Sequence, residues 1–359
     1  VIMIFNNIYK DKKILVTGHT GFKGSWLCKW LELLGAEVVG FSLQSITNPN
    51  HFNNISIKMD SIIGNVKNYN ELNDVFKKHK PDLVFHLAAQ PSVIVSYNDP
   101  IDTFTSNVIG TANILDICRF HECVKGIVIV TTDKCYDNKE WVYPYRETDN
   151  LGGFDPYSAS KACSEIVTSS YRNSFLKNNK ILVASARAGN VIGGGDWVAD
   201  RLVPDAVIAA NNKKTLLLRN PLSKRPWQHV LEPLSGYLLL GQKMLENDNK
   251  IAEAWNFGPS NDSNLSTRDL IKLMNKHWSL IISQEVENPN AFHEASLLML
   301  DSTKATNLLK WSPVWNINET IKHTVDWYKS FYNNQEVITE KQINIYVNNA
   351  LEKGLKWTN

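Results

Sequence analysis

A glycine-rich turn close to the N-terminus constrains the fold of this chain more than any other feature. Thr17–Gly24, with the sequence TGHTGFKG, follows the apolar run Ile14–Thr17 and opens the helical stretch Lys23–Leu34. Three glycines at GxxGxxG spacing let the backbone turn tightly and approach a pyrophosphate, to which the helix N-terminus offers free N–H groups. Any tight loop can use glycine, but the place between a strand and a helix predicts a dinucleotide-binding turn.

The first half of the chain alternates β-branched runs with helical stretches, which is typical of parallel βαβ units. Six runs are predicted to be strands: Ile14–Thr17, Val38–Phe41, Ser61–Val66, Leu83–Leu87, Ile127–Thr131 and Ile181–Ala186. These runs are nearly all apolar, as expected for strands that are covered on both faces. The sequence therefore predicts an α/β fold with a Rossmann-type doubly wound parallel sheet, and a long helix over Tyr157–Phe175.

The regular alternation weakens after Arg187, where a loop with three successive glycines follows. A chain of 359 residues is long enough for two units on the usual domain sizes. We therefore predict a dinucleotide-binding domain over residues 1–187, to which a segment near residues 229–258 returns. Residues 188–359 are predicted to form a smaller mixed α/β lobe for the substrate.

Charge and cysteine content argue against several classes of protein. A net charge of +2 lacks the excess of basic residues that a nucleic-acid surface needs. The five cysteines are scattered without a CxxC pair, which predicts reduced thiols in a cytoplasmic protein and neither a disulfide framework nor a metal site. No run reaches the roughly 20 apolar residues of a membrane helix. We expect a soluble protein with no membrane and no nucleic-acid partner.

The residues after the second predicted strand favour NAD over NADP. The acid expected about 20 residues after the turn to bind the ribose is absent, because Ser42 stands at the strand end, and no arginine is there to meet a 2′-phosphate. Lys23 either adds charge near the pyrophosphate or is a solvated helix lysine. Asn65 either reaches the adenine or is an ordinary polar loop residue.

Tyr157 and Lys161 lie four residues apart at the start of the predicted long helix, so both side chains share one face. A nearby ammonium lowers the pKa of a phenol, which would let Tyr157 accept a proton from a substrate hydroxyl at neutral pH. Thr132, at the end of the fifth predicted strand, is placed to hydrogen-bond that hydroxyl. The pattern predicts the oxidation of a bound alcohol.

Asp133 and Lys134 follow Thr132 at the sheet edge where α/β active sites lie. An oxidation or an epimerisation needs no further acid and base at this place. An elimination does, because one group removes a carbon-bound proton while another protonates the departing hydroxyl. The two residues therefore favour an elimination, and the alternative is a surface ion pair at a strand end.

Several motifs together resemble the extended short-chain dehydrogenases that act on nucleotide sugars. They are the glycine turn, Leu87-Ala88-Ala89-Gln90, Thr132-Asp133-Lys134, Tyr157-Ser158-Ala159-Ser160-Lys161 and Arg187-Ala188-Gly189-Asn190-Val191. Within that family, TGHTGFKG, Asp133-Lys134-Cys135-Tyr136, Gly193-Gly194-Gly195-Asp196-Trp197, Arg225-Pro226-Trp227-Gln228-His229 and Trp255-Asn256-Phe257-Gly258-Pro259 look like the 4,6-dehydratases of CDP-glucose. The resemblance covers nearly the whole chain and is weak past about Gln335.

The resemblance implies an NAD-dependent hydro-lyase that converts CDP-D-glucose to CDP-4-dehydro-6-deoxy-D-glucose in deoxysugar and lipopolysaccharide O-antigen biosynthesis. It implies oxidation at C4 with Tyr157 as base, loss of water across C5–C6 with Asp133 as general acid, and return of the hydride to C6. Lys134 stands where dTDP-glucose relatives carry Glu and is the candidate C5 base, for which the amine must be neutral. The resemblance also implies a homodimer joined through helices around Asp102–Arg119 and Tyr157–Phe175.

Two other interpretations stay open at this point. A related enzyme, either a 4,6-dehydratase or a 4-epimerase for another nucleotide sugar, would share most of these motifs. A non-catalytic, dinucleotide-sensing protein would need the glycine turn but not the intact set Thr132, Tyr157 and Lys161.

Three sets of candidate site residues follow from the motifs and the resemblance. The catalytic set is Thr132, Asp133, Lys134, Tyr157 and Lys161. The cofactor set is Gly18, His19, Thr20, Gly21, Phe22, Lys23, Gly24, Ser42, Asn65, Val66, Leu87, Ala88, Ala89, Gln90, Asn107, Tyr157 and Lys161. The substrate set is Asn190, Asp196, Trp197, Arg201, Arg225, His229, Asn256 and Glu294. Arg225 and Arg201 are the candidates for the diphosphate; the alternative is that they are ordinary surface arginines. Asp196, Trp197 and Glu294 either shape the substrate pocket or have a structural role.

Overall fold

The centre of the molecule is a parallel sheet of seven strands. The computed structural model describes residues 3–178, 180–260, 263–286 and 297–359. The strands are β1 (Lys13–Thr17), β2 (Glu37–Ser42), β3 (Asp60–Ile63), β4 (Leu83–His86), β5 (Gly126–Val130), β6 (Leu182–Ala188) and β11 (Ala254–Phe257). Their order is β11-β6-β5-β4-β1-β2-β3. The strand order therefore reverses between β1 and β4, and sheets of this type bind ligands outside the carboxyl ends of such strands.

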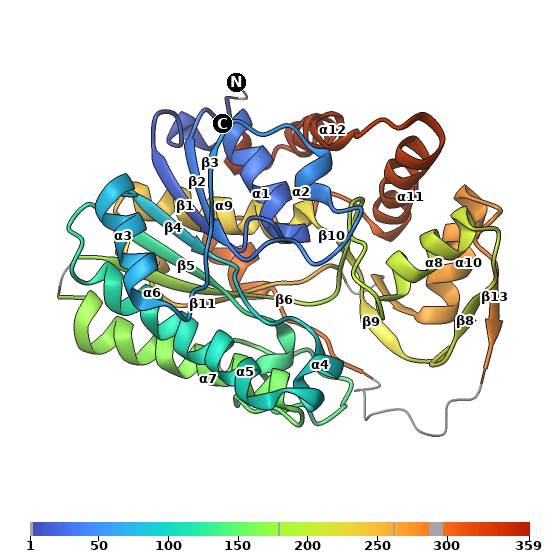
Figure 1. Ribbon diagram of the computed structural model, residues 1–359, viewed down its shortest axis with the longest axis horizontal. Helices are drawn as coiled ribbons and strands as arrows, with labels where there is room; N and C mark the ends of the chain where they lie inside the picture. Colours follow the sequence, from blue (N-terminus) through green and yellow to red (C-terminus); the bar gives the residue numbers. More distant parts are fainter. Residues whose placement is uncertain (1–2, 179, 261–262, 287–296) are drawn as a thin grey trace.

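Two separate layers of helices cover the two faces of the sheet (Figure 1). One layer holds α1 (Phe22–Leu33) and α9 (Leu231–Leu245), and the other holds α3 (Tyr69–His79), α6 (Gly110–Cys118) and α7 (Pro156–Tyr171). In β1, Ile14 and Val16 pack into the first layer and Leu15 into the second. This alternation follows from the two-residue period of a strand, and it explains why a strand covered on both faces is apolar throughout.

Most of the chain after β6 forms a smaller lobe beside the sheet (Figure 1). Its elements are β7 (Val191–Ile192), α8 (Leu202–Asn211), β8 (Leu216–Leu218), β9 (Lys224–Pro226), β10 (Gln228–His229), β12 (Asn264–Ser266), α10 (Thr267–His277), β13 (Ser283–Glu285) and α11 (Ile317–Asn334). Three two-stranded sheets join β7 with β10, β9 with β12 and β8 with β13. Between these elements the chain returns to the central sheet, because α9 covers one face and β11 pairs with β6.

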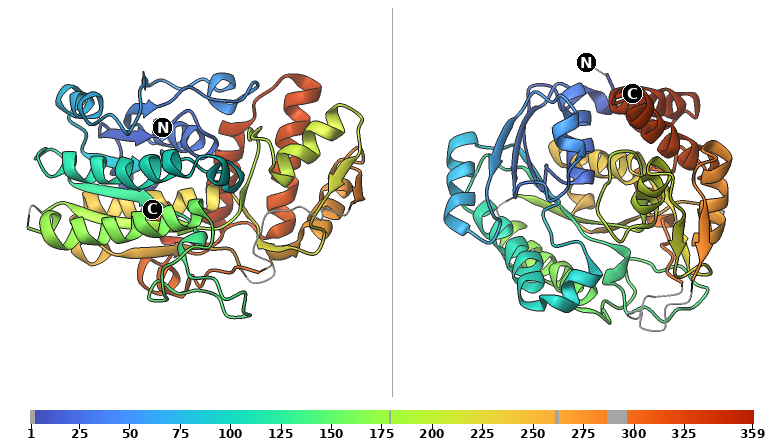
Figure 2. Two further views of the ribbon diagram at one scale, coloured as in Figure 1. Left: turned by 60° about the horizontal axis from the view of Figure 1, so that its bottom comes forward. Right: turned by 45° about the vertical axis from the view of Figure 1, so that its right-hand side comes forward.

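The late helix α12 (Thr339–Glu352) packs on α1 and not on the smaller lobe alone. Lys29 of α1 pairs with Glu340 at 3.1 Å, and the rings of Trp30 and Tyr346 meet edge to face at 5.7 Å. Figure 2 shows α12 beside the N-terminal segment. The first layer of helices is therefore completed by residues from near both ends of the chain.

The structure confirms the predicted fold class, and each of the six predicted strands lies on an observed strand. The third strand is shorter than predicted, since β3 ends at Ile63 and leaves Asn65 and Val66 in a loop. The predicted helix Tyr157–Phe175 ends at Tyr171 and continues as a π-helical turn. Among the described residues, no helix is both long and apolar enough to cross a membrane.

Candidate active site

The glycine turn joins β1 to α1 at the carboxyl edge of the sheet. Gly18 has a φ angle of +77°, and a Cβ atom on it would lie 2.8 Å from the amide nitrogen of Ala88. A Cβ atom on Gly24 would lie 2.1 Å from the carbonyl oxygen of Gly18. Only glycine fits either position. The helix begins after Gly21 at Phe22 without a side-chain cap, so its first N–H groups are available to a phosphate.

Side chains of the turn anchor it to the ends of β2 and β3. Thr20 Oγ1 lies 2.8 Å from Ser42 Oγ and donates to the carbonyl oxygen of Leu43 at 2.7 Å. His19 Nε2 lies 2.7 Å from Ser61 Oγ. Burial lowers the pKa of His19 to about 4, so its imidazole is neutral. Three of the predicted cofactor residues thus fix the shape of the turn.

The loop Leu87–Gln90, which follows β4, lies against the turn and is held from α7. The Gln90 N–H donates to Asn107 Oδ1 at 2.8 Å. Asn107 Nδ2 donates in return to the Gln90 carbonyl at 3.1 Å and to Ser160 Oγ at 2.8 Å. Asn107 is buried, and these bonds occupy its side chain. Its role in this structure is to hold the loop in place.

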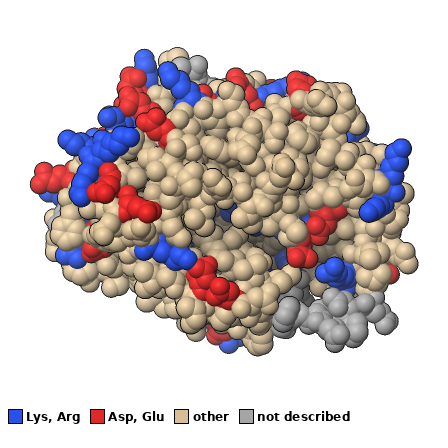
Figure 3. All heavy atoms as spheres, viewed as in Figure 1, with Lys and Arg blue, Asp and Glu red and all other residues tan. Residues whose placement is uncertain are grey.

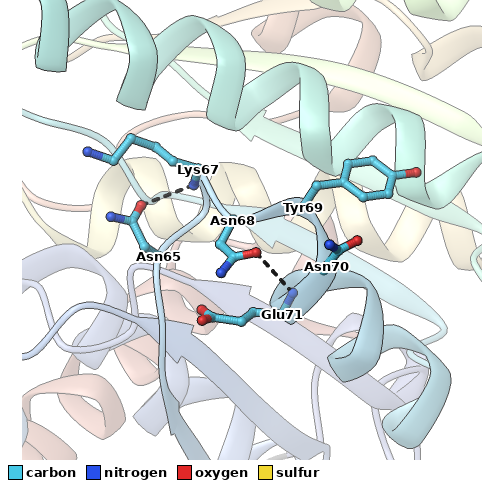
Figure 4. A pocket seen from close by; sticks show the side chains of 6 residues that line it. All are labelled: Asn65, Lys67, Asn68, Tyr69, Asn70 and Glu71. Carbon is cyan, nitrogen blue, oxygen red and sulfur yellow. Dashed lines mark hydrogen bonds between the residues drawn. The ribbon is translucent and has the colours of Figure 1, made fainter.

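A shallow hollow lies where the chain leaves β3 and enters α3 (Figure 4). It is lined by Asn65, Lys67, Asn68, Tyr69, Asn70 and Glu71. Asn65 Oδ1 accepts the Lys67 N–H at 3.0 Å, and the Val66 carbonyl accepts Asn113 Nδ2 at 2.9 Å. Both predicted adenine-side residues therefore lie in a loop that its own hydrogen bonds shape, at the same sheet edge as the glycine turn.

Tyr157 and Lys161 lie in the first turns of α7, but their environment differs from the prediction in one respect. Burial raises the pKa of Tyr157 to about 12, although a hydrogen bond with Thr132 acts in the opposite direction and lowers it. Lys161 Nζ donates to the carbonyl oxygen of Val130 at 3.3 Å, and burial lowers the pKa of Lys161 to about 8. The predicted depression of the Tyr157 pKa is therefore wrong for this structure, because the loss of solvent outweighs the hydrogen bond.

Thr132, Asp133 and Lys134 form a short turn directly after β5. Thr132 Oγ1 donates to Asp133 Oδ1 at 2.9 Å and accepts the Lys134 N–H at 3.3 Å. Asp133 is 2% exposed, and its Oδ2 has no hydrogen-bond partner among the described residues. Burial raises the pKa of Asp133, opposed chiefly by the charge of Lys134. The carboxyl group therefore keeps its proton to a higher pH than an exposed aspartate does.

Three further basic residues lie close to these groups. The pKa of Lys23 is lowered to about 8, chiefly by burial and then by the charge of Lys161. The charge of Arg201 lowers it further, and the charge of Asp133 raises it. Arg225 is buried on β9 and acts on the charge of Asp133. Arg201 donates to Asp196 at 2.8 Å. Burial lowers the pKa of Arg201, but the Asp196 carboxylate outweighs it, so the pKa is raised overall. The turn, the catalytic candidates and two arginines of the smaller lobe thus come together.

The structure does not bring every predicted substrate residue to this place. Trp197 is buried among the rings of Trp327, Tyr328 and Phe331. His229 is fully buried between Trp26 and Trp315. Asn256 is fully buried and bonds the hydroxyl of Tyr136 and the carbonyls of Tyr145 and Asp301. These three side chains serve the interior of the protein, because packing or internal hydrogen bonds occupy them.

Asn190 and Glu294 are the remaining two predicted substrate residues. Asn190 is half-buried between β6 and β7, and its carbonyl accepts the Gln228 N–H at 3.1 Å. Glu294 lies outside the described residues.

Glu165, one turn beyond Lys161 on α7, was not singled out from the sequence. Its carboxylate accepts Ser185 Oγ at 2.6 Å, the Thr131 hydroxyl at 2.5 Å and Arg187 Nη2 at 2.9 Å. These partners more than offset its burial, so the pKa of Glu165 is lowered. The four-residue step from Lys161 to Glu165 was visible in the sequence, but not the arginine that pairs with it.

Comparisons with known proteins agree with this arrangement. A family model described as GDP-mannose 4,6 dehydratase matches residues 15–324. The CDP-glucose 4,6-dehydratase of Salmonella typhimurium is 42% identical over 354 residues, which cover 96% of this chain and 99% of that protein. The CDP-paratose 2-epimerase of Salmonella typhi is 26% identical, with 89% of this chain and 99% of that protein covered.

Solved structures share the fold at low sequence identity. An epimerase from Methanothermobacter thermautotrophicus superposes with a TM-score of 0.81 at 23% identity, covering 94% of this chain and 98% of that one. A dTDP-glucose 4,6-dehydratase from Bacillus anthracis, solved in complex with NAD, gives 0.74 at 22% identity, covering 89% and 97%. The sheet, the glycine turn and the Tyr157–Lys161 pair define an extended short-chain dehydrogenase of the nucleotide-sugar branch. The chain belongs to the GDP-mannose 4,6-dehydratase family.

Proposed function

We propose that this protein is an NAD-dependent hydro-lyase that converts CDP-D-glucose to CDP-4-dehydro-6-deoxy-D-glucose. The observation that carries the proposal is the buried Asp133, with its raised pKa and an unpartnered oxygen, close to Tyr157 and Thr132. An alcohol oxidation alone needs no such acid. The 42% identity to a CDP-glucose 4,6-dehydratase over nearly the whole chain supports the choice of substrate.

The residues of the turn fit a dinucleotide. Gly18 and Gly24 leave space that any Cβ atom would fill, and the uncapped start of α1 offers N–H groups to a pyrophosphate. Lys23 adds positive charge at the same place. Ser42, and no acid, stands at the end of β2, with its hydroxyl already bonded to Thr20. We therefore place NAD over residues 18–24, with Asn65 and Val66 on its adenine side.

The first chemical step is removal of the C4 hydroxyl proton. Bound NAD in its oxidised form supplies a hydride acceptor for C4, a positive charge that favours ionisation of Tyr157, and later the hydride for C6. Tyr157 is the base, and Thr132 is placed to orient the same hydroxyl through its bond to Tyr157. Lys161 is held in the interior by the Val130 carbonyl, one helical turn from Tyr157 on α7.

The second step is loss of water across C5–C6. The 4-ketone makes the C5 proton acidic, and a base must remove it while an acid protonates the leaving hydroxyl. Asp133 is our candidate for the acid, because burial raises the pKa of its carboxyl group and so favours the protonated form. Lys134, half-buried and adjacent to it, is the candidate base.

We further propose that residues 188–359, apart from the segment near 229–258, form the nucleotide-sugar lobe, and that residues 1–187 hold the cofactor. Arg225 and Arg201 are our candidates for the diphosphate, since a guanidinium matches phosphate oxygens with paired N–H groups. Asn190, which follows β6, and Asp196, which pairs with Arg201, are further candidates for the substrate site. The assignment of cytosine rests on the relative and not on any residue described above.

The proposed assembly is a homodimer, in the cytoplasm, that serves deoxysugar and O-antigen synthesis. Ile101, Ile109, Ile166 and Phe175 are exposed on α5 (Pro100–Phe104), the following π-helical turn, α7 and its extension. Exposed apolar side chains on elements that pack against one another support association of two copies. On the face drawn in Figure 3, acidic and basic side chains are interspersed around a mostly uncharged centre.

The decisive assay incubates the protein with CDP-glucose and follows the 4-keto product by its absorbance in alkali. Mass spectrometry should show loss of one water, and in deuterated solvent one deuterium should enter at C5. No product from CDP-glucose, but product from dTDP- or GDP-glucose, would overturn the substrate and leave the reaction. A 4-epimer without loss of water would overturn the reaction, and NAD binding without any turnover would leave only a dinucleotide sensor.

A further inference from the structure

A buried histidine outside the active site links the glycine turn to the late helices. His51, on the short helix α2 (His51–Asn54), is 2% exposed and stacks on Trp26 of α1 with ring centres 5.1 Å apart. Its Nδ1 lies 2.7 Å from Ser25 Oγ, and its Nε2 lies 2.7 Å from Thr339 Oγ1. Ser25 directly follows Gly24 of the turn, and Thr339 begins α12. One imidazole therefore joins three helices.

The hydrogen bonds of this cluster have one consistent direction. Trp327 Nε1 donates to Thr339 Oγ1 at 2.9 Å, and Ser25 Oγ donates to the Phe22 carbonyl at 2.9 Å. With both hydroxyls so engaged, Thr339 donates its own proton to His51 Nε2, and His51 donates its Nδ1 proton to Ser25 Oγ. The opposite tautomer would leave the Thr339 proton without an acceptor and would compete for the Ser25 proton. Burial also lowers the pKa of His51 to about 3, which keeps the ring neutral.

The chain of hydrogen bonds ends in the turn itself. It runs from Trp327 on α11 through Thr339 and His51 to Ser25, and its last acceptor is the carbonyl of Phe22, at the start of α1. Four of the five residues are buried, so solvent does not replace a missing member. A hydroxyl lost on α12 therefore changes the hydrogen bonding of the first turn of α1.

The same cluster holds the loop before α8. Trp26 Nε1 donates to the Gly194 carbonyl at 2.9 Å. A Cβ atom on Gly194 would lie 1.9 Å from the Trp327 ring, and one on Gly195 would lie 2.4 Å from the His51 ring. This loop leads to Asp196, which binds Arg201. The same cluster therefore contacts both the glycine turn and the loop that leads to Asp196 and its partner Arg201.

We propose that His51 is a positioning residue, which through this hydrogen-bond chain makes the affinity of the glycine turn for its dinucleotide depend on the packing of α11 and α12. The inference rests on the proposed function in that the turn binds NAD. His51 touches no substrate and takes no part in the chemistry. Figure 1 shows α1, α2, α11 and α12 gathered on one side of the molecule.

The test removes the hydroxyl at the remote end of the chain. Thr339→Val keeps the shape of the side chain and should weaken NAD binding roughly fivefold, about the effect of one buried hydrogen bond, as measured by calorimetric titration. Thr339→Ser restores the hydroxyl and should return the NAD affinity to that of the wild type. The kcat for CDP-glucose at saturating NAD should stay within about twofold, so that the change lies in KM for NAD.

Thr324→Val is the matched control. Thr324 is as deeply buried on α11, but within the described part of the chain its hydroxyl bonds only the Thr320 carbonyl of its own helix. The Thr324→Val variant should lose about as much thermal stability as Thr339→Val but keep the NAD affinity of the wild type. Equal NAD affinity in Thr339→Val and the wild type, or an equal loss in Thr324→Val, would overturn the positioning role. If the wild type itself binds no NAD in the titration, the proposed function fails and not this inference alone.

A second variant cuts the chain next to the turn. Ser25→Ala should weaken NAD binding at least as much as Thr339→Val, and the double variant should be no weaker than Ser25→Ala, because the chain is already broken. Independent, additive losses would show that the two ends act separately and would also overturn the proposal.

Discussion

Two buried carboxyl groups at the same sheet edge differ in their hydrogen bonding, and their pKa values are shifted in opposite directions. Glu165 accepts bonds from Thr131, Ser185 and Arg187, and the pKa of Glu165 is lowered. Asp133 has one bond, from Thr132, and an oxygen without a partner among the described residues, and burial raises its pKa. A satisfied buried carboxylate stabilises the fold, whereas an incompletely satisfied one is available for chemistry. Burial alone does not distinguish the two residues, but this difference supports our proposal that Asp133 is catalytic and Glu165 structural.

The largest effect is expected at Asp133. Asp133→Asn removes the proton donor and should lower kcat for dehydration about 10³-fold, within the usual range for a general acid. Its stability at neutral pH should not fall, because the ionised form of a buried, poorly paired carboxyl is costly. Product assays and thermal melts check both. A full rate in this variant would show that another group protonates the leaving hydroxyl.

Glu165→Gln is the same chemical change at the satisfied carboxyl. It should destabilise the protein by roughly 3 kcal/mol, because it leaves the buried Arg187 without its counter-ion. Urea denaturation monitored by tryptophan fluorescence measures this loss. Replacing both Glu165 and Arg187 with apolar residues should recover much of the stability. Unchanged unfolding in Glu165→Gln would contradict the structural role of the pair.

Lys134→Ala tests our candidate for the C5 base, which directly follows the proposed acid Asp133. We expect about a 10²-fold loss of C5 deuterium exchange, the lower end for a lost acid–base group, while oxidation at C4 persists. The exchange is followed by mass spectrometry in deuterated solvent. Wild-type exchange rates in this variant would remove Lys134 from the mechanism and assign the proton to another amine.

The smallest effect is the pH dependence of stability, which should have opposite sign at the two carboxyls. The raised pKa of Asp133 gives stability that is present at low pH and lost as pH rises through its folded value. The lowered pKa of Glu165 gives stability that is present at neutral pH and lost as pH falls through its folded value. Between about pH 3 and pH 7, the stability of Asp133→Asn relative to wild type should rise, and that of Glu165→Gln should fall. Parallel slopes in denaturant titrations would refute the contrast.

Local pattern was enough to predict six of the seven strands, but β11, which returns late in the chain to pair with β6, was not predicted as a strand. The strand that contains Leu15 is apolar throughout because helices cover both of its faces, and its hydrophobic run shows this directly. The glycine turn was recognisable because Gly18 and Gly24 sit where no side chain fits. Such features depend on neighbours in sequence or on simple geometry.

Contacts between residues that are far apart in the sequence could not be predicted. Asn256 and His229 are residue types that often line sites, but here internal bonds or aromatic rings occupy them. Glu165 was missed because it lies on α7, whereas the arginine that pairs with it, Arg187, lies on β6. The predicted direction of the Tyr157 pKa failed because spacing reveals a neighbouring lysine but not how much water the fold removes.

The packing of α12 on α1 has a consequence for how the molecule is made. Trp30 of α1 is covered by Tyr346 and Trp357, which leave the ribosome long after the sheet strands. A nascent chain that has already formed its nucleotide-binding half must therefore leave this tryptophan without these two partners until Tyr346 and Trp357 have been made. Chaperones would meet an apolar helix face during that interval, and competence to bind a dinucleotide would arise only after synthesis has passed α12.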